Sequence, residues 1–322
     1  RALRDGRKVL VLLAGEALGE LGQRLAWRIA NATGASLMAD FVNGRLARGQ
    51  GRLPLERVPY GVDAAVSALK DFSDIVLVGA KAPVGFFAYP GKPSRHYPEE
   101  ARLHRLSRPE QDPLAALAAL ADELGAPDAA IPAAGPRPEP GRGAVTAEGF
   151  ARTVAALLPE NAIVVDESVS FGRGFYPHTH AAAPNDWLHI PGGAIGGGMP
   201  VATGAAIGAG GGRRVLNLQA DGSGMYSLQA LWTQAREKLP CTTVVMANRK
   251  YNILIGEYLN VGANPGPTAM TMLDLGHPDL DWVRLANGMG VEAAKAETLE
   301  DCADLMSESF RRPGPFLIEL VV

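Results

Sequence analysis

Polar residues that could bind a metal stand at the ends of two apolar segments in the second half of the sequence. Asp221 closely follows the segment 215–218, and Asn248 closely follows the segment 242–246. Both segments have the composition of buried parallel strands, whose carboxyl ends meet at one edge of a sheet. Carboxylate and amide oxygens are hard ligands of the kind that Mg²⁺ prefers. The pair therefore predicts a magnesium site at that edge, completed by a backbone carbonyl, phosphate oxygens and water.

The residues that follow Asp221 favour a diphosphate beside such a metal. Gly222 would let the backbone approach a phosphate closely, and Ser223 would add a hydroxyl donor. A helix that begins just after this turn would point its N–H groups at the same anion. An Asp-Gly-Ser triplet alone is more often an ordinary turn. The separation of 248 − 221 = 27 residues between the two polar strand ends, with one helix between them, favours the metal-diphosphate interpretation.

This arrangement resembles the signature of the thiamine-diphosphate-dependent enzymes, in which an Asp-Gly pair is followed at this spacing by an Asn. The sequence departs from that signature at Ala220 and Arg249, where a glycine and a second asparagine are common. The resemblance implies that the metal ligands are Asp221, Asn248 and the main-chain oxygen of Lys250. The cofactor-binding residues that it implies in this region are Asp221, Gly222, Ser223, Asn248, Tyr251 and Asn252.

The resemblance extends upstream of this signature. The segment 192–200 looks like the one that holds the aminopyrimidine end of the cofactor. By that match the Gly193 carbonyl accepts from the 4′-amino group, and Ile195 forces the cofactor into its bent conformation. The alternative is that these residues only let a helix pack closely on the sheet. The segment 166–170 looks like the matching loop at the diphosphate, where Ser170 offers a hydroxyl.

The elements that must position these residues alternate between strands and helices, which indicates parallel α/β sheets. The sequence predicts strands at 8–13, 36–38 and 74–78 in its first third, with helices at 16–32, 62–72 and 114–124. After a stretch rich in proline and glycine, it predicts a helix capped by Thr146 and strands at 162–165, 215–218, 242–246 and 316–322. The predicted organisation is a Rossmann-like central α/β domain at 1–125, a linker at 126–145 and a thiamine-diphosphate-binding fold at 146–322.

The resemblance covers nearly the whole chain and is closest to the acetolactate synthase large subunit, benzoylformate decarboxylase and pyruvate oxidase group. It implies thiamine diphosphate and Mg²⁺ as cofactors and a small 2-keto acid as substrate. These enzymes take their activating glutamate from a preceding pyrimidine-binding domain. No segment of this sequence looks like that domain, and the chain begins at Arg1. We therefore expect an N-terminal pyrimidine-binding domain to be missing, and the catalytic acid remains unknown.

The reaction is left open between two chemistries. We expect acetolactate-synthase-like carboligation after decarboxylation, and benzoylformate-type decarboxylation is the alternative. Pyruvate decarboxylases of this superfamily carry a glutamate where Leu254 aligns, so Leu254 argues against simple acetaldehyde formation. Glu257 is a proton-transfer group or an exposed helix residue. A third possibility, from another class, is a non-catalytic paralogue or assembly subunit that keeps only the fold.

Composition limits the partners and the compartment. The 322 residues carry a net charge of −3, are 47% hydrophobic and include two cysteines, which predicts no nucleic-acid partner and a reducing, cytoplasmic setting. No apolar run reaches the length of a membrane helix. The shared cofactor sites of the family imply a homodimer or homotetramer.

Some relatives bind FAD, but no GxGxxG supports FAD here. His178 and His180 are interpreted as loop residues, and Arg45, Arg48 and Arg52 as a solvated face.

Overall fold

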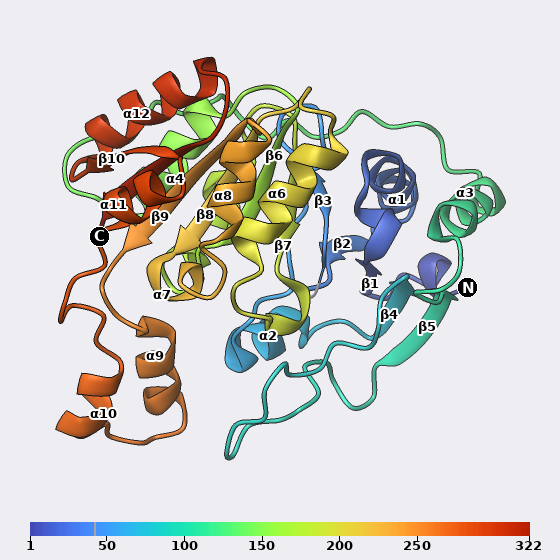
Figure 1. Ribbon diagram of the computed structural model, residues 1–322. Helices are drawn as coiled ribbons and strands as arrows, with labels where there is room; N and C mark the ends of the chain where they lie inside the picture. Colours follow the sequence, from blue (N-terminus) through green and yellow to red (C-terminus); the bar gives the residue numbers. More distant parts are fainter. Residues whose placement is uncertain (42) are drawn as a thin grey trace. The chain divides into compact units, whose positions relative to one another are not determined.

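The computed structural model describes residues 1–41 and 43–322, which divide into two compact units (Figure 1). The first comprises residues 1–47 and 51–134, and the second comprises residues 48–50 and 135–322. Each unit contains a parallel sheet with helices packed on it, so the predicted α/β class with two parallel-sheet domains is confirmed. The boundary at 134/135 lies within the proline- and glycine-rich stretch.

The first unit is built on a four-stranded parallel sheet in the order β2-β1-β4-β5. Its central strands are buried along their whole length, which explains their unbroken apolar sequences. The Asp112 side chain caps the last helix by accepting from the N–H groups of Leu114 and Ala115. The elements are β1 (Val9–Leu13), α1 (Glu20–Thr33), β2 (Ser36–Ala39), α2 (Val62–Leu69), β4 (Asp74–Val78), β5 (Arg102–Ser107) and α3 (Pro113–Leu124), with 3-10 turns η1 (Ala2–Arg4) and η2 (Gly15–Leu18).

The second unit carries the longer sheet, in the order β10-β11-β9-β8-β6-β7-β3. The pairs from β10 through to β7 are parallel, so their carboxyl ends lie at one edge. The strands are β3 (Leu46–Arg48), β6 (Ala162–Glu167), β7 (Asn185–His189), β8 (Val215–Ala220), β9 (Cys241–Ala247), β10 (Glu292–Ala296) and β11 (Phe316–Val321).

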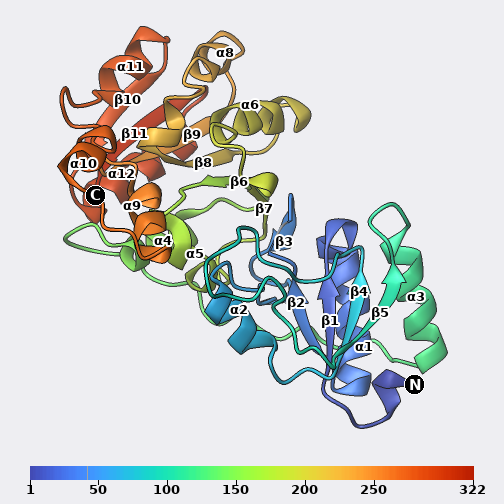
Figure 2. The ribbon, with the colours of Figure 1, turned by 90° about the horizontal axis from the view of Figure 1, so that it is seen from below.

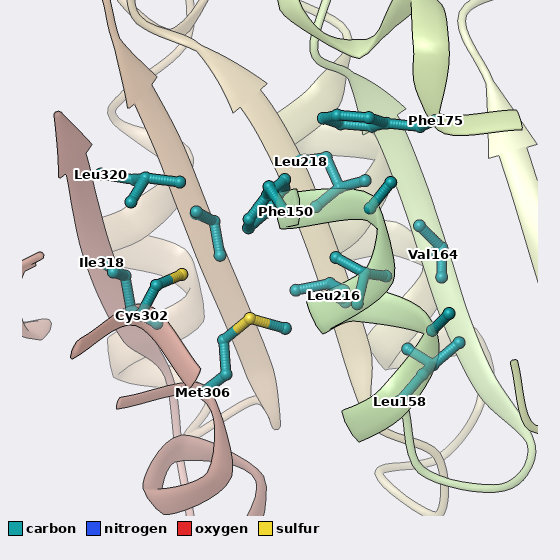
Figure 3. Close-up of a cluster of buried hydrophobic side chains, with 14 of the residues drawn as sticks. Phe150, Leu158, Val164, Phe175, Leu216, Leu218, Cys302, Met306, Ile318 and Leu320 are labelled. Atoms are coloured by element: carbon teal, nitrogen blue, oxygen red, sulfur yellow. The ribbon is translucent and has the colours of Figure 1, made fainter. Parts of the chain in front are cut away.

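Helices cover both faces of this sheet (Figure 2). On one face, α4 and α12 pack over alternate strand residues, and Figure 3 shows Phe150 of α4 and Met306 of α12 within this cluster. The other face is covered by α6, α8 and α11. The helices are α4 (Ala147–Leu157), α5 (Phe175–His178), α6 (Gly198–Gly208), α7 (Asp221–Gly224), α8 (Ala230–Arg236), α9 (Asn252–Asn260), α10 (Pro267–Met272), α11 (Trp282–Gly288) and α12 (Leu299–Arg311), with 3-10 turns η3 (Phe171–Gly174) and η4 (Pro191–Gly193).

Arg48 corrects one expectation from the sequence. It is 2% exposed and therefore does not belong to a solvated face. Its guanidinium donates to Thr179 Oγ1 at 2.9 Å and to the Tyr176 carbonyl at 2.5 Å, and it stacks 4.0 Å from the Tyr176 ring centroid. These bonds and the ring contact compensate for the loss of water around a buried charge. Arg48 is thus an internal residue of the second unit.

Four strands escaped the sequence analysis because none of them has a long continuous apolar run: β3, which has only three residues, β5, β7 and β10. β5 and β10 lie at sheet edges and are largely or partly exposed, and β7 reads Asn-Asp-Trp-Leu-His. Edge strands need fewer apolar residues because one of their sides has no neighbouring strand to pack against.

Across residues 1–41 and 43–322, no helix combines the length and the apolar character needed to cross a membrane.

Candidate functional site

The two polar strand ends lie on neighbouring strands of the second unit. β8 and β9 pair in parallel, with Ala220 opposite Met246. Asp221 follows β8 directly as the first residue of the one-turn helix α7, and Asn248 follows β9 directly. The fold therefore brings together the two side chains whose spacing suggested a metal site, at the edge where open parallel sheets bind ligands.

Asp221 ties the two strand ends together. Its carboxylate is 2% exposed, accepts from its neighbour Gly222 N at 2.7 Å through Oδ1, and accepts from Arg249 N at 2.6 Å through Oδ2. Burial raises the pKa of the Asp221 carboxyl, and the backbone N–H groups partly offset that rise. A divalent cation beside this carboxylate would favour its charged form, so its chemistry fits a metal ligand.

The loop that carries Asn248 is fixed by a second segment of the chain. Asn248 Oδ1 accepts from Lys250 N at 3.0 Å, and Arg249 adopts a left-handed conformation with φ of 56°. The Arg249 carbonyl accepts from Leu275 N at 2.8 Å, and Tyr251 N donates to the Leu273 carbonyl at 2.9 Å. Asparagine tolerates a positive φ better than arginine does, so the departure at Arg249 places a strained residue where the signature has a second asparagine.

Gly222 and Ser223 form a close-packed turn between these ligands. A Cβ at Gly222 would lie 2.6 Å from Cε1 of the Tyr251 ring, so no larger residue fits this position without a shift of that ring. Burial raises the pKa of the Tyr251 hydroxyl. Ser223 is 5% exposed and its Oγ donates to the Ala220 carbonyl at 3.1 Å. The single hydroxyl proton of Ser223 is engaged by Ala220, so donation to a diphosphate would require this bond to break.

The glycine segment 192–198 reaches the same region. Gly193 ends the turn η4 with a φ of 65°, and Ile195 is 46% exposed. The carbonyl of Gly196 accepts from Ser227 Oγ at 2.7 Å. An exposed isoleucine between conformationally special glycines suits an apolar support for a ligand.

Glu167 is the residue that the sequence analysis missed. It lies at the end of β6, is 3% exposed, and its carboxylate accepts from the backbone N–H groups of Gly196, Gly197 and Gly198 at 2.7, 3.2 and 2.7 Å. Gln219 Nε2 also donates to Glu167 at 2.8 Å. An acid at the end of an apolar strand was the available signal in the sequence, and it does not tell which N–H groups the carboxylate reaches.

The other predicted residues occupy more peripheral positions. Ser170 is half-buried at the start of η3, where its side chain makes no capping bond, whereas the neighbouring Ser168 donates to Asp166 Oδ1 at 2.5 Å. Asn252 is exposed as the first residue of α9. Leu254, at 46% exposure, and the half-buried Glu257 belong to the same helix.

The histidines do not form a metal pair. His178 ends α5 and is exposed, while His180 lies beside the buried Arg48, with 3.4 Å between Nδ1 and the guanidinium. Burial, assisted by the charge of Arg48, lowers the pKa of His180 to about 3. Throughout the described ranges, no group of three or more His, Cys, Asp or Glu side chains is arranged to hold a metal ion. The predicted metal site would take only one carboxylate from the protein, because the other two predicted protein ligands, Asn248 and the Lys250 carbonyl, are neutral oxygens.

Residues 172–320 match the family described as "Thiamine pyrophosphate enzyme, C-terminal TPP binding domain". A Mycobacterium tuberculosis protein, provisionally named acetolactate synthase large subunit IlvX, is 45% identical over 99% of this chain. Benzoylformate decarboxylase of Pseudomonas aeruginosa is 31% identical over 80% of this chain.

The fold agrees with a solved structure. The thiamine diphosphate-dependent 4-hydroxybenzoylformate decarboxylase of Rhodococcus jostii RHA1 matches 98% of this chain with a TM-score of 0.77 and 27% identity. The chain spans 62% of the mycobacterial protein, 50% of the Pseudomonas enzyme and 61% of the Rhodococcus structure.

Proposed function

Because the chain belongs to the thiamine-diphosphate-dependent enzyme family, we propose that the whole protein uses thiamine diphosphate and Mg²⁺ to decarboxylate a small 2-keto acid and to join the product to a second carbonyl compound, as an acetolactate synthase does. The observation that carries this proposal is the 2.6 Å bond from Arg249 N to Asp221 Oδ2, which closes the Asp221 turn onto the Asn248–Lys250 loop.

Different residues of this chain would bind different parts of the cofactor. The proposed metal ligands are Asp221, Asn248 and the carbonyl oxygen of Lys250, with Gly222 and Ser223 at the diphosphate. Gly193 and Ile195 would orient the aminopyrimidine end, with Ser170, Tyr251 and Asn252 at the remaining edges and Leu254 and Glu257 towards the substrate. When bound, thiamine diphosphate supplies the nucleophilic carbon and the electron sink for decarboxylation. The chain itself fixes the position of that group and, through Ile195 and Leu254, lines its surroundings with apolar surface.

Decarboxylation of an aromatic 2-keto acid without carboligation is the second candidate. The similarity to one benzoylformate decarboxylase and one 4-hydroxybenzoylformate decarboxylase favours it, as does the apolar Leu254, which is 46% exposed. Product analysis of the full-length protein with pyruvate and with benzoylformate separates the two. Acetolactate from pyruvate supports the first candidate, and benzaldehyde from benzoylformate with no acetolactate supports the second.

Asp221→Asn tests the metal site. An amide in place of the carboxylate removes the only formal negative charge among the proposed protein ligands, so we expect Mg²⁺-dependent binding of thiamine diphosphate to weaken by roughly 100-fold or more, which corresponds to about 2.7 kcal/mol. Isothermal titration calorimetry of the full-length protein measures this loss.

Asp304→Asn is the matched control, because Asp304 is an exposed aspartate on α12. It should bind the cofactor as the wild type does. Equal affinities of the wild type and Asp221→Asn for thiamine diphosphate would contradict the proposal that Asp221 binds the metal. A wild-type protein that binds no thiamine diphosphate would favour a non-catalytic paralogue or assembly subunit.

The partners and compartment of the whole protein follow as proposals from the same function. The substrate is a small molecule, and we propose a homodimer or homotetramer in the cytoplasm, without nucleic acid or membrane. The free, buried Cys241 and Cys302 agree with a reducing compartment. The domain division at 126–145 likewise stays a proposal.

A further inference from the structure

Glu167 binds three consecutive N–H groups at the start of α6. Its Oε1 accepts from Gly196 and Gly197, and its Oε2 accepts from Gly198. The N-cap residue of α6 is Gly197, which has no side chain that could bond the free N–H groups of the helix. The carboxylate of a neighbouring strand therefore takes the place of a local capping side chain and faces the positive end of the helix dipole.

The negative charge of Glu167 is stabilised by hydrogen bonds from neutral donors. Within the described part of the chain, no lysine, arginine or histidine forms an ion pair with this 3% exposed carboxylate. The donors are the three glycine N–H groups and Gln219 Nε2. A buried carboxylate is costly unless such donors are fixed around it, so the glycine segment and the carboxylate hold each other in place.

Gln219 extends these bonds to the turn that carries the proposed metal ligand. Glu167 and Gln219 are register partners on β6 and β8. Gln219 Nε2 lies 2.8 Å from Glu167 Oε2 and 2.6 Å from Ser223 Oγ. One network thus joins the glycine segment, which carries Gly193 and Ile195, to the α7 turn of Asp221 and Ser223.

A larger residue at the start of α6 would disturb this network. A Cβ at Gly198 would lie 2.3 Å from Gln219 Oε1 and 2.8 Å from Glu167 Oε2, so both side chains would have to shift. The close approach of backbone to carboxylate is what makes the bond from Gly198 N possible.

We propose that Glu167 is a positioning residue, which fixes the separation between the glycine segment 192–198 and the Asp221–Gly224 turn before thiamine diphosphate binds. This inference rests on the proposed function, in which these two segments hold opposite halves of the cofactor. A ligand that must touch both segments gains affinity when their separation is already set, because less ordering accompanies binding. A ligand that touches only one segment gains much less.

The chain offers a matched control in Glu319. This glutamate of β11 is also 3% exposed and also accepts from a helix N-terminus, at 3.1 Å from Trp282 N and 3.4 Å from Val283 N. Its helix is α11, which carries none of the proposed cofactor-binding residues. Unlike Glu167, Glu319 also has a cationic neighbour, with 3.8 Å between its Oε1 and Lys295 Nζ. Glu319→Gln therefore removes a buried charge from the same sheet and breaks no hydrogen bond of the glycine segment or of the α7 turn.

The test compares Glu167→Gln with Glu319→Gln in the full-length protein with Mg²⁺. Calorimetry measures the dissociation constants of thiamine diphosphate and of inorganic pyrophosphate, which can occupy only the metal and the α7 turn. In Glu167→Gln, the new side-chain amide would point N–H groups at the glycine donors. We expect this variant to weaken thiamine diphosphate roughly 10–100-fold, the usual effect of removing a partner that orients a site, and pyrophosphate much less. Both variants should lower Tm, but Glu319→Gln should change neither affinity.

An equal loss of affinity for both ligands, or the same loss in Glu319→Gln, would overturn the positioning role. A second measurement needs no variant and covers the case in which Glu167→Gln does not fold. Hydrogen exchange of the ligand-free wild type should show protected amides at residues 196–198, and free exchange there would equally overturn the inference. Wild-type protein that binds neither ligand would instead contradict the proposed function, so the two failures are distinguishable.

Discussion

His180 stands out among the individual residues because it is buried beside a positive charge. Its pKa is lowered to about 3 by burial and by Arg48, whereas the unfolded chain should titrate near 6.5. The native state therefore holds His180 neutral, and the unfolded state binds more protons below pH 6.5. The stability that the neutral ring contributes is present above pH 6.5 and is lost as the pH falls towards 3.

We predict that this loss appears in urea unfolding between pH 7 and pH 5. The slope is at most about 1.4 kcal/mol per pH unit and is reduced by solvent around the half-buried ring. His180→Gln should remove most of this dependence. His178→Gln, at an exposed position two residues away, should retain it. A wild-type unfolding midpoint that does not decline on acidification would contradict the assignment.

At the scale of elements, α12 stabilises the sheet face opposite Glu167. Met306 of this helix is fully buried in the cluster formed by α4, α12 and the strands beneath them (Figure 3). Met306→Ala would leave a cavity and should lower the free energy of unfolding by about 2–5 kcal/mol.

The control for that cavity is Asp304→Ala on the exposed side of the same helix, which should stay within about 0.5 kcal/mol of the wild type. Denaturant titration measures both values. Neither variant should alter the affinity for thiamine diphosphate. A change in affinity after Met306→Ala would mean that the two sheet faces are coupled.

The sequence was most informative where a local pattern decides the position of a residue. The placement of Asp221 and Asn248 at neighbouring strand ends could be predicted because each follows an apolar strand directly. Thr146 could be predicted as the cap of a helix, and its Oγ1 accepts from Gly149 N at the start of α4. The bonds of Glu167 could not be predicted, since their donors are backbone groups 29–31 residues away. A composition signal carries no information on which N–H groups a side chain will reach.

Other features could not be predicted because the interacting residues lie far apart in the sequence. The partners of Arg48 lie 128 and 131 residues further on, so its charge alone suggested solvent exposure. β7 was missed because its buried residues, Asn185, Asp186 and Trp187, include two polar side chains. Apolar periodicity identifies elements that are buried by hydrophobic side chains, but not those buried by polar side chains with hydrogen-bond partners.

At the scale of the whole molecule, the second unit is not continuous in sequence. Residues 48–50 belong to it, although the rest of it begins at residue 135. Arg48 supplies this unit with hydrogen bonds to Thr179 and Tyr176 and lies 4.9 Å from the Trp187 ring centroid. A fragment of residues 135–322 would lack these contacts.

We therefore predict that Arg48→Ala in the full chain destabilises the second unit by about 1.5–3 kcal/mol, the range for hydrogen bonds made by a charged group. Arg45→Ala, at an exposed position nearby, should have little effect. Thermal unfolding followed by tryptophan fluorescence measures both. The fragment 135–322 should unfold at a temperature close to that of the Arg48→Ala variant, and wild-type stability of the fragment would argue against this role.

The two cysteines give the molecule a practical property. Cys241 and Cys302 are both fully buried, and burial raises the pKa of each thiol to about 12. Neither forms an appreciable amount of thiolate at neutral pH, and the thiolate is the form that reacts. Maleimide and iodoacetamide reagents should therefore leave the folded protein unlabelled. A single cysteine placed at Met272, which is 76% exposed, would carry a fluorophore or spin label by itself, with both native cysteines still in place.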